Sequence, residues 1–388
     1  MRPPSRRGVV AGLLCAGVPQ RLLAAAAPPP PLATLAEAKG LLFGTSVGAG
    51  RPGSLTGMLA DPRMMAIVAR ECGTIVAENE MKQYVVAARP DTLDFAPGDR
   101  IADWAAAHGK RMRGHTLLWN HPRYTPAWLE QRYADAPVEA LARWLTDYVG
   151  SVAGHYGTRV YAWDVVNETI DPATGALRDT LFQRKLGFEA IRLAFATAKA
   201  RAPHARLVYN DYMSWGAGGA KHRAGVLALL RRFRDEGVPC DALGIQSHLG
   251  TEQSTDALSV DMVRSRERER DWRAFVDAVV GMGYRLALTE FDVGDRDLSG
   301  TIAQRDAQVA AVAGDYLTMM LSYRQVDELL CWGLVDRYSW LQNFSPRRDG
   351  APLRPCPFDS AYRPKPLRAA IARAIAAAPR RTDAAPRG

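Results

Sequence analysis

Short apolar runs alternate with longer amphipathic stretches along most of this chain. The runs are rich in Val, Ile, Leu and Ala and are bounded by turn or polar residues, which is typical of buried β-strands. We predict eight strands, at Leu41–Val47, Thr74–Glu78, Arg111–Leu118, Val160–Asn167, Arg206–Asn210, Ala242–Ser247, Arg285–Glu290 and Glu328–Leu334.

Helical spacing of apolar residues marks the stretches between these strands. The clearest examples are Val138–Tyr148, Phe182–Lys199, Ala220–Arg234, Asp271–Val280, Gln304–Met320 and Pro366–Ala378. Strands that alternate with helices indicate parallel βαβ units, and eight such units can close into a barrel. We therefore predict an α/β protein with a single (β/α)8 TIM barrel over residues 37–378.

The N-terminal segment differs from the rest of the chain. Residues 1–27 have a basic start, an apolar run from Val9 to Val18, and four alanines before a run of prolines. This pattern predicts a signal peptide, and the paired Arg6 and Arg7 suggest the twin-arginine export route. We expect residues 28–36 to be an Ala/Pro-rich linker and residues 379–388 a polar tail.

The apolar run in the signal is too short to span a bilayer, and no later segment has the length of a transmembrane helix. We therefore expect a periplasmic or secreted protein that is a monomer and makes no membrane contact after processing. A lipid anchor on Cys15 is a weaker alternative, because Leu14 precedes it where a lipoprotein signal has a small residue.

Composition and charge argue against one functional class, the nucleic-acid-binding proteins. The 388 residues are 47% hydrophobic and carry a formal charge of +9. Four arginines and no acidic residue fall within residues 1–27, so removing that segment lowers +9 to +5. The remaining excess forms no basic patch interleaved with aromatic residues, which argues against a nucleic-acid partner.

Cysteine spacing gives no sign of a metal site. Cys72, Cys240, Cys331 and Cys356 form no CxxC motif, and no HExxH occurs. An oxidising compartment permits disulfides, but four cysteines allow three pairings and the sequence does not choose among them. The chain also has no P-loop and no GxGxxG after the first strand.

Polar and aromatic residues follow seven of the predicted strands. In a (β/α)8 barrel the active site forms at these C-terminal ends. Amide, imidazole and ammonium groups bind sugar hydroxyls, and tryptophan faces stack on sugar rings, so the residue types suit a sugar polymer. The candidates are Glu78, Asn79, Lys82, His115, Trp119, Asn167, Glu168, Asn210, Tyr212, Gln246, His248, Glu290, Asp292, Trp332 and Trp340.

Two of these candidates form a pair with a specific chemistry. Glu168 closes the run VYAWDVVNE, and Glu290 lies in RLALTEFDV. Two carboxyl groups presented by facing strands are what glycosidic bond cleavage requires, one to protonate the leaving oxygen and one to act as nucleophile or base.

Six motifs in order, ENEMK, GHTLLW, WDVVNE, GIQSHL, LTEFDV and WGLVDRYSW, resemble the family 10 glycoside hydrolases. The resemblance runs from about Leu41 to about Leu367, and the best-known members are endo-β-1,4-xylanases. It implies a retaining mechanism with Glu168 as acid/base and Glu290 as nucleophile, and no metal or cofactor. The expected partner is xylan or a xylo-oligosaccharide.

The resemblance also implies roles for the neighbouring residues. Asn167 would bind the sugar 2-hydroxyl, His248 and Asp292 would hold Glu290 ionised, and Gln246 and Asn210 would complete the polar surround. The substrate clamp on the non-reducing side would comprise Glu78, Asn79, Lys82, His115 and Trp119. Trp332 and Trp340 would cover the sugar at the cleavage point, and Tyr212 either lines the product side or packs a loop.

Some positions depart from the family pattern. Gln83 stands where an aromatic residue is common, Asn120 replaces the usual histidine, and Arg354–Pro357 resembles an insertion. These departures leave open another β-1,4-glycan, such as a glucan or an aryl glycoside, as substrate. A non-catalytic carbohydrate-binding barrel is the alternative from another class.

Overall fold

The computed structural model describes Met1 and residues 29–119, 121–250 and 266–381. The chain divides into two units, Met1–Pro30 and Pro31–Gly388, and the second contains the barrel. The predicted signal peptide lies, apart from Met1, outside the described residues and stays a prediction. Asn120 lies outside them as well.

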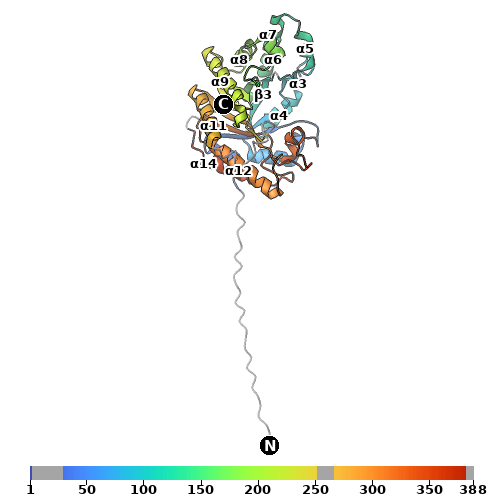
Figure 1. Ribbon diagram of the computed structural model, residues 1–388. Helices are drawn as coiled ribbons and strands as arrows, with labels where there is room; N and C mark the ends of the chain where they lie inside the picture. The colour runs from blue at the N-terminus through green and yellow to red at the C-terminus, as the bar shows by residue number, and fades with distance from the viewer. Residues whose placement is uncertain (2–28, 120, 251–265, 382–388) are drawn as a thin grey trace. The chain divides into compact units, whose positions relative to one another are not determined.

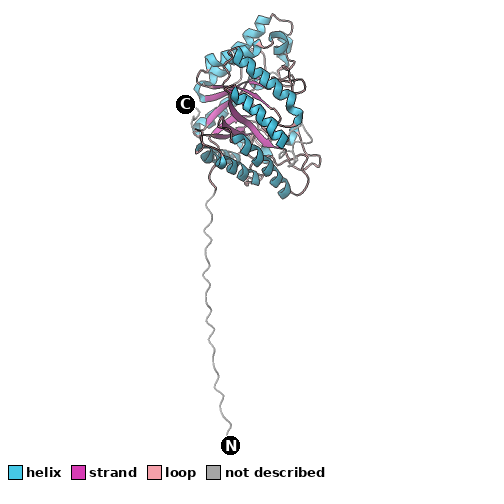
Figure 2. Cartoon of the chain, turned by 60° about the vertical axis from the view of Figure 1, so that its left-hand side comes forward, coloured by secondary structure: helices cyan, strands magenta, loops and turns pink. Residues whose placement is uncertain are grey.

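A closed barrel of parallel strands forms the centre of the second unit, as predicted (Figure 2). Each strand pairs with its neighbours in chain order, β6 pairs with β8, and β9 returns to β1 to close the barrel. The barrel strands are β1 (Leu42–Val47), β2 (Thr74–Ala77), β3 (Arg111–Leu118), β4 (Val160–Asn167), β5 (Arg206–Asp211), β6 (Ala242–Ile245), β8 (Arg285–Val293) and β9 (Val326–Cys331).

A helix follows each barrel strand and covers the outside of the sheet (Figure 2). In chain order these helices are α2 (Pro62–Glu71), α4 (Ala96–Ala107), α6 (Val138–Tyr156), α8 (Glu189–Arg201), α9 (Ala220–Asp235), α11 (Arg266–Gly281), α12 (Ile302–Leu321) and α14 (Pro366–Ala377). Shorter helices are α1 (Leu32–Glu37), α3 (Gln83–Val86), α5 (Ala127–Tyr133), α7 (Leu181–Leu186) and α13 (Leu341–Phe344). Figure 1 shows α12 and α14 side by side, so the last two long helices of the barrel pack against each other.

The barrel strands are buried on both faces, which explains why they read as nearly continuous apolar runs. Trp163 in β4 is fully buried and lies over Gly114 of the neighbouring strand β3. A Cβ atom at Gly114 would lie 2.1 Å from the Trp163 ring, so glycine is required there for close packing.

Several strands end at other residues than predicted, because of the backbone conformation at their ends. The last strand ends at Cys331 instead of Leu334, because Gly333 adopts a φ of 100°. The sixth ends at Ile245 instead of Ser247, whose φ is 63°, and a short strand β7 (His248–Leu249) follows. Since β7 pairs with the end of β8, β8 continues beyond Glu290 to Val293.

The helix predicted at Phe182–Lys199 is two helices, α7 and α8, because Gly187 has a φ of 59° and ends the first. The helix predicted to end at Tyr148 continues to Tyr156, where Gly157 follows with a φ of 50°. In each case, a glycine in the left-handed region sets the boundary.

Both predicted ends of the barrel domain need correction. Residues 32–37, placed mostly in a linker, form helix α1, in which Leu32 and Ala36 are fully buried. The Leu32 amide donates to Glu71, which also pairs with Arg368 of α14 at 3.0 Å. At the other end, Arg381 is buried and donates to the Val326 and Leu321 carbonyls, while residues 382–388 lie outside the described residues.

The four cysteines that the structure describes are all unpaired. Cys72, Cys331 and Cys356 are buried, and burial raises the pKa of each thiol. Within residues 29–119, 121–250 and 266–381, no helix combines the length and apolar character needed to cross a membrane.

Candidate active site

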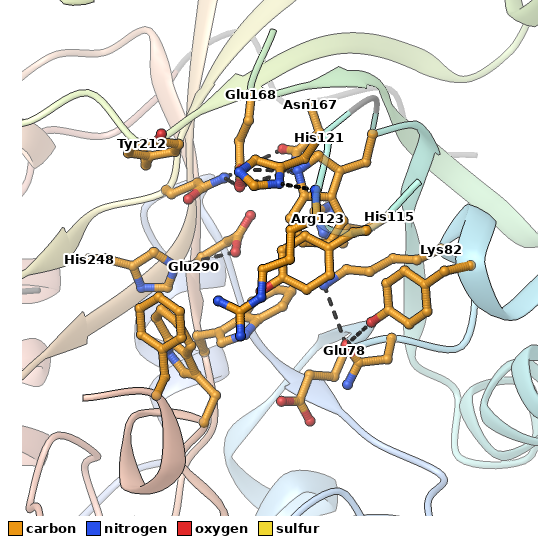
Figure 3. Close-up of a pocket in the computed structure, with 18 residues that line it drawn as sticks. Glu78, Lys82, His115, His121, Arg123, Asn167, Glu168, Tyr212, His248 and Glu290 are labelled. Atoms are coloured by element: carbon orange, nitrogen blue, oxygen red, sulfur yellow. Dashed lines mark hydrogen bonds and ion pairs between the residues drawn. The ribbon is translucent and has the colours of Figure 1, made fainter. Parts of the chain in front are cut away.

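A cleft of about 330 Å³ lies at the C-terminal ends of the barrel strands (Figure 3). The predicted site residues line it, with the exception of Asn210 and Asp292, which lie behind the lining and contact it. The lining residues predicted from sequence are Glu78, Asn79, Lys82, His115, Trp119, Asn167, Glu168, Tyr212, Gln246, His248, Glu290, Trp332 and Trp340.

Glu168 directly follows β4 and has a φ of 56°, a left-handed conformation that is uncommon outside glycine. Its backbone amide donates to the Asn210 carbonyl at 2.9 Å, which fixes the turn. Three side chains donate to its carboxyl group: the Trp119 indole to Oε2 at 2.9 Å, and the Gln246 and Asn167 amides to Oε1 at 2.8 and 3.2 Å. The carboxyl group is therefore held in one orientation toward the cleft (Figure 3).

Glu290 lies in β8 and is only 5% exposed. The Asn210 amide donates to its Oε1 at 2.7 Å, and His248 Nε2 lies 3.3 Å from its Oε2. The Thr289 hydroxyl donates to the Asn210 oxygen, so the Asn210 amide nitrogen is directed at Glu290.

A chain of side-chain amides connects the two glutamates. Asn210 Nδ2 contacts both Glu290 and the Asn167 oxygen, the latter at 2.9 Å, and Asn167 in turn lies 3.2 Å from Glu168 Oε1. Both carboxyl groups project into the same space in Figure 3. The two groups are thus positioned by one hydrogen-bonded unit.

The two carboxyl groups have opposite pKa shifts. Burial is the main cause that raises the pKa of Glu168 above its ordinary value, and the nearby charge of Glu290 raises it further. Burial also acts to raise the pKa of Glu290, but the charges of His115, His248 and Lys82 and the hydrogen bond from His248 outweigh it and lower the pKa. The pKa of one carboxyl is therefore raised and that of its neighbour lowered, and opposite shifts of this kind are what separate an acid from a nucleophile.

His248 carries the positive charge that Glu290 requires. Burial acts to lower the pKa of His248, but Asp292 and Glu290 together raise it to about 10. Its Nδ1 lies 3.0 Å from Asp292, whose other oxygen accepts a hydrogen bond from the Trp340 indole at 2.8 Å. Asp292 thus orients both an imidazolium and a cleft tryptophan.

His115 is held from below the cleft. Its Nδ1 lies 2.9 Å from Asp164, which also pairs with the fully buried Arg113 at 2.5 Å. Arg113 reaches Glu328 at 2.6 Å, so the carboxylates of two strands hold one guanidinium in the barrel interior. The His115 ring meets Trp332 edge-on, with centroids 5.4 Å apart.

Glu78 and Lys82 line the side of the cleft that faces His248 (Figure 3). Burial raises the pKa of Glu78 to about 8, despite the opposing charge of Lys82. The Lys82 ammonium group lies 4.7 Å from the Trp119 ring centre, within the range of a cation–π contact. This wall offers one buried acid and one cation to sugar hydroxyls.

Five cleft residues were not predicted, and they come from loops and short helices. Tyr124 stacks on Trp119 with ring centres 4.3 Å apart, and Tyr84 donates to Asn79 at 2.6 Å. These positions do not follow a predicted strand, so the pattern did not mark them. The only feature of the sequence that could have indicated them is the group of aromatic residues near Trp119. The five are Tyr84, His121, Arg123, Tyr124 and Phe344.

We expect Trp119→Phe to move the alkaline limb of the kcat/KM profile to higher pH. The indole hydrogen bond stabilises ionised Glu168, so removing it raises the pKa of this carboxyl further. The acidic limb, set by Glu290, should stay in place because the Trp119 indole makes no hydrogen bond to it. The pH dependence of kcat/KM on a short aryl glycoside measures both limbs, and an alkaline limb that moved to lower pH would contradict this account.

The family model described as "Glycosyl hydrolase family 10" matches residues 31–374. A β-1,4-xylanase of Dictyoglomus thermophilum is 32% identical over 311 residues, which cover 77% of this chain and 81% of the relative. Endo-1,4-beta-xylanase 5 of Pyricularia oryzae is 31% identical over 359 residues, 89% of this chain and 79% of the relative.

A solved structure gives the same result. Xylanase 10B from Thermotoga petrophila, in complex with xylobiose, superimposes with a TM-score of 0.75 at 26% identity, covering 90% of this chain and 98% of that chain. The matched region includes the barrel and every candidate site residue. This chain therefore belongs to glycosyl hydrolase family 10.

Proposed function

We propose that the protein is a retaining endo-β-1,4-xylanase, with Glu168 as general acid/base and Glu290 as nucleophile. The observation that carries this proposal is the pair of buried carboxyl groups with opposite pKa shifts in one tryptophan-lined cleft. The relatives named β-1,4-xylanases and the structural neighbour that binds xylobiose support the choice of substrate.

In the first step, Glu290 Oε attacks the anomeric carbon and the bond from that carbon to the leaving oxygen breaks. Glu168 gives its proton to that oxygen, so the released chain leaves as an alcohol. Burial of Glu168 raises its pKa and so favours the protonated form that this step requires. The ionised state of Glu290, supported by His248 and Lys82, supplies the electron pair.

In the second step, the charge relations reverse. Esterified Glu290 no longer carries a negative charge, so its repulsion of an ionised Glu168 is lost. The pKa of Glu168 falls, and the carboxylate takes a proton from water as the water attacks the anomeric carbon. The bond from that carbon to the Glu290 oxygen breaks, and Glu290 leaves as a carboxylate. The products are a free sugar with retained configuration and the two glutamates in their starting states.

Xylan is preferred over glucan in this proposal because xylose lacks the C6 hydroxymethyl group. Trp332, which is 5% exposed, is packed against His115, and Trp340 is held by Asp292. These fixed indoles leave little freedom to accommodate a larger sugar at the cleavage point. The sugar without the extra group is therefore the better fit.

The test is hydrolysis of xylan by residues 28–388 of the chain, with carboxymethyl-cellulose as a matched polymer. We expect xylo-oligosaccharides and a rapid fall in viscosity with xylan, since an endo enzyme cuts internal bonds, and at least about tenfold lower kcat/KM on the glucan. Equal or greater activity on carboxymethyl-cellulose would make the glucan the substrate. Binding of xylan without any release of sugar would support a non-catalytic barrel.

A further inference from the structure

A second cavity, of about 150 Å³, shares no lining residue with the catalytic cleft. It lies between the loop 87–93, helix α5 and helix α6. Helix α6 contributes Trp144, Asp147, Tyr148 and Ser151, whose spacing places them on one face of the helix. Helix α5 contributes Trp128, and we call this cavity the aromatic pocket.

The aromatic rings of this pocket are held in fixed orientations. Trp144 stacks on Tyr148 with ring centres 5.2 Å apart and planes 8° apart. Trp128 meets Trp144 edge-on, with centres 5.6 Å apart and planes at 80°. Trp128 and Trp144 are only half-buried, so part of each indole remains open to a ligand. Rings that are already ordered lose little conformational entropy when a ligand binds.

The charges at the rim favour a neutral ligand. Asp91 pairs with Arg132 through two contacts, at 2.7 and 2.9 Å, and the Arg132 guanidinium lies 5.3 Å from the Trp128 ring centre. The other charged lining residues, Arg89 and Asp147, have opposite signs. A neutral molecule with an apolar face for an indole and hydroxyls at its edge fits this surface, and a pyranose ring has both.

The same two chain segments form a wall of the aromatic pocket and a wall of the cleft. Tyr84 and Tyr124 line the cleft, and Ala87 and Trp128 follow closely in sequence and line the aromatic pocket. The Trp128 indole donates to the Ala87 carbonyl at 2.9 Å and joins the two segments. The two surfaces are therefore connected by short segments, three residues from Tyr84 to Ala87 and four from Tyr124 to Trp128.

We propose that the aromatic pocket is a second sugar-binding site, which holds one pyranose unit of the polysaccharide outside the catalytic cleft. The identity of the glycan as xylan rests on the function proposed above. Holding the polymer at a second point raises the effective concentration of chain at the cleft and lowers KM for long substrates. The chemical step is untouched.

Two pocket variants and one control test this site. Trp144→Ala removes one of the two half-buried indoles, and Ser151→Leu fills the pocket from the exposed face of α6. Arg143→Leu places the same side chain at an exposed position of α6 that does not line the pocket. For each protein, KM is measured on soluble xylan and on an aryl xylobioside, whose two sugars occupy the cleft alone.

We expect both pocket variants to raise the ratio of KM on xylan to KM on the aryl xylobioside by about fivefold, since the contact with one stacked sugar is lost. The Arg143→Leu ratio should equal that of the parent. Unchanged ratios in Trp144→Ala and Ser151→Leu, with thermal unfolding like the parent, would overturn the proposal.

A binding measurement separates this inference from the proposed function. Electrophoresis through a gel containing xylan, with the cleft saturated by xylobiose, reports the aromatic pocket even if the protein hydrolyses nothing. Retardation of the parent that is reduced in Ser151→Leu and retained in Arg143→Leu supports the site. Equal mobility of all three proteins in the presence and absence of xylan would contradict it.

Discussion

Glu290→Gln should reduce kcat on xylan by about 10⁴- to 10⁶-fold, because the variant lacks the oxygen that bonds to the anomeric carbon. Glutamine has nearly the same shape, so the cleft should keep its form and KM should change little. The parent carboxylate accepts a hydrogen bond from Asn210 and faces the His248 imidazole. The amide also leaves that imidazole without its second carboxylate, which should lower the pKa of His248.

The measurement is initial-rate kinetics on xylan together with thermal unfolding. Glu130→Gln is a matched control, because Glu130 is an exposed carboxylate on α5 that pairs with Arg184 outside the cleft. It should retain parental kcat. A Glu290→Gln variant that kept more than about one hundredth of parental kcat would rule out this residue as nucleophile.

Glu168→Ala should produce an effect that depends on the leaving group. On xylan, whose leaving sugar alcohol needs a proton, we expect kcat to fall by about 10²- to 10⁴-fold, the usual contribution of general acid catalysis. The dinitrophenolate group of a dinitrophenyl xylobioside leaves without protonation, so formation of the glycosyl-enzyme from this substrate should be far less affected. Hydrolysis of that intermediate should become limiting, because no base activates water.

Azide tests the second step, hydrolysis of the glycosyl-enzyme, in the same variant. Removing Glu168 leaves space beside the anomeric carbon and removes a negative charge that would repel an anion. Azide is a nucleophile that needs no general base, so it should restore turnover of the dinitrophenyl substrate and yield a glycosyl azide of retained configuration. A Glu168→Ala variant that lost activity equally on both substrates, without rescue by azide, would contradict the acid/base assignment.

The barrel and the position of Glu168 and Glu290 in one cleft could be predicted from sequence because both depend on local signals. Strands buried on both faces read as apolar runs, and the fold places their C-terminal ends together. Glu168 and Glu290 are separated by more than a hundred residues, yet each lies at or near the end of such a run. Once the barrel was predicted, their proximity followed from its closure.

Residues that act through loops or long-range contacts could not be predicted in this way. Tyr124 and Phe344 reach the cleft only because their segments fold back over it, and no periodic pattern encodes that path. The Arg113–Glu328 pair crosses the barrel interior between β3 and β9, which are not neighbouring strands. Helix α1 is short and weakly patterned, and its burial depends on contacts with Glu71 that lie far along the chain.

In the proposed mechanism, Glu290 forms a covalent bond to the sugar and cleavage occurs by two displacements. Proton NMR of the first products released from a xylo-oligosaccharide tests it most directly, because the anomeric signals appear before mutarotation mixes them. Two displacements predict that the β-anomer appears first and the α-anomer grows in later. Initial release of the α-anomer would show a single displacement and would contradict the role assigned to Glu290.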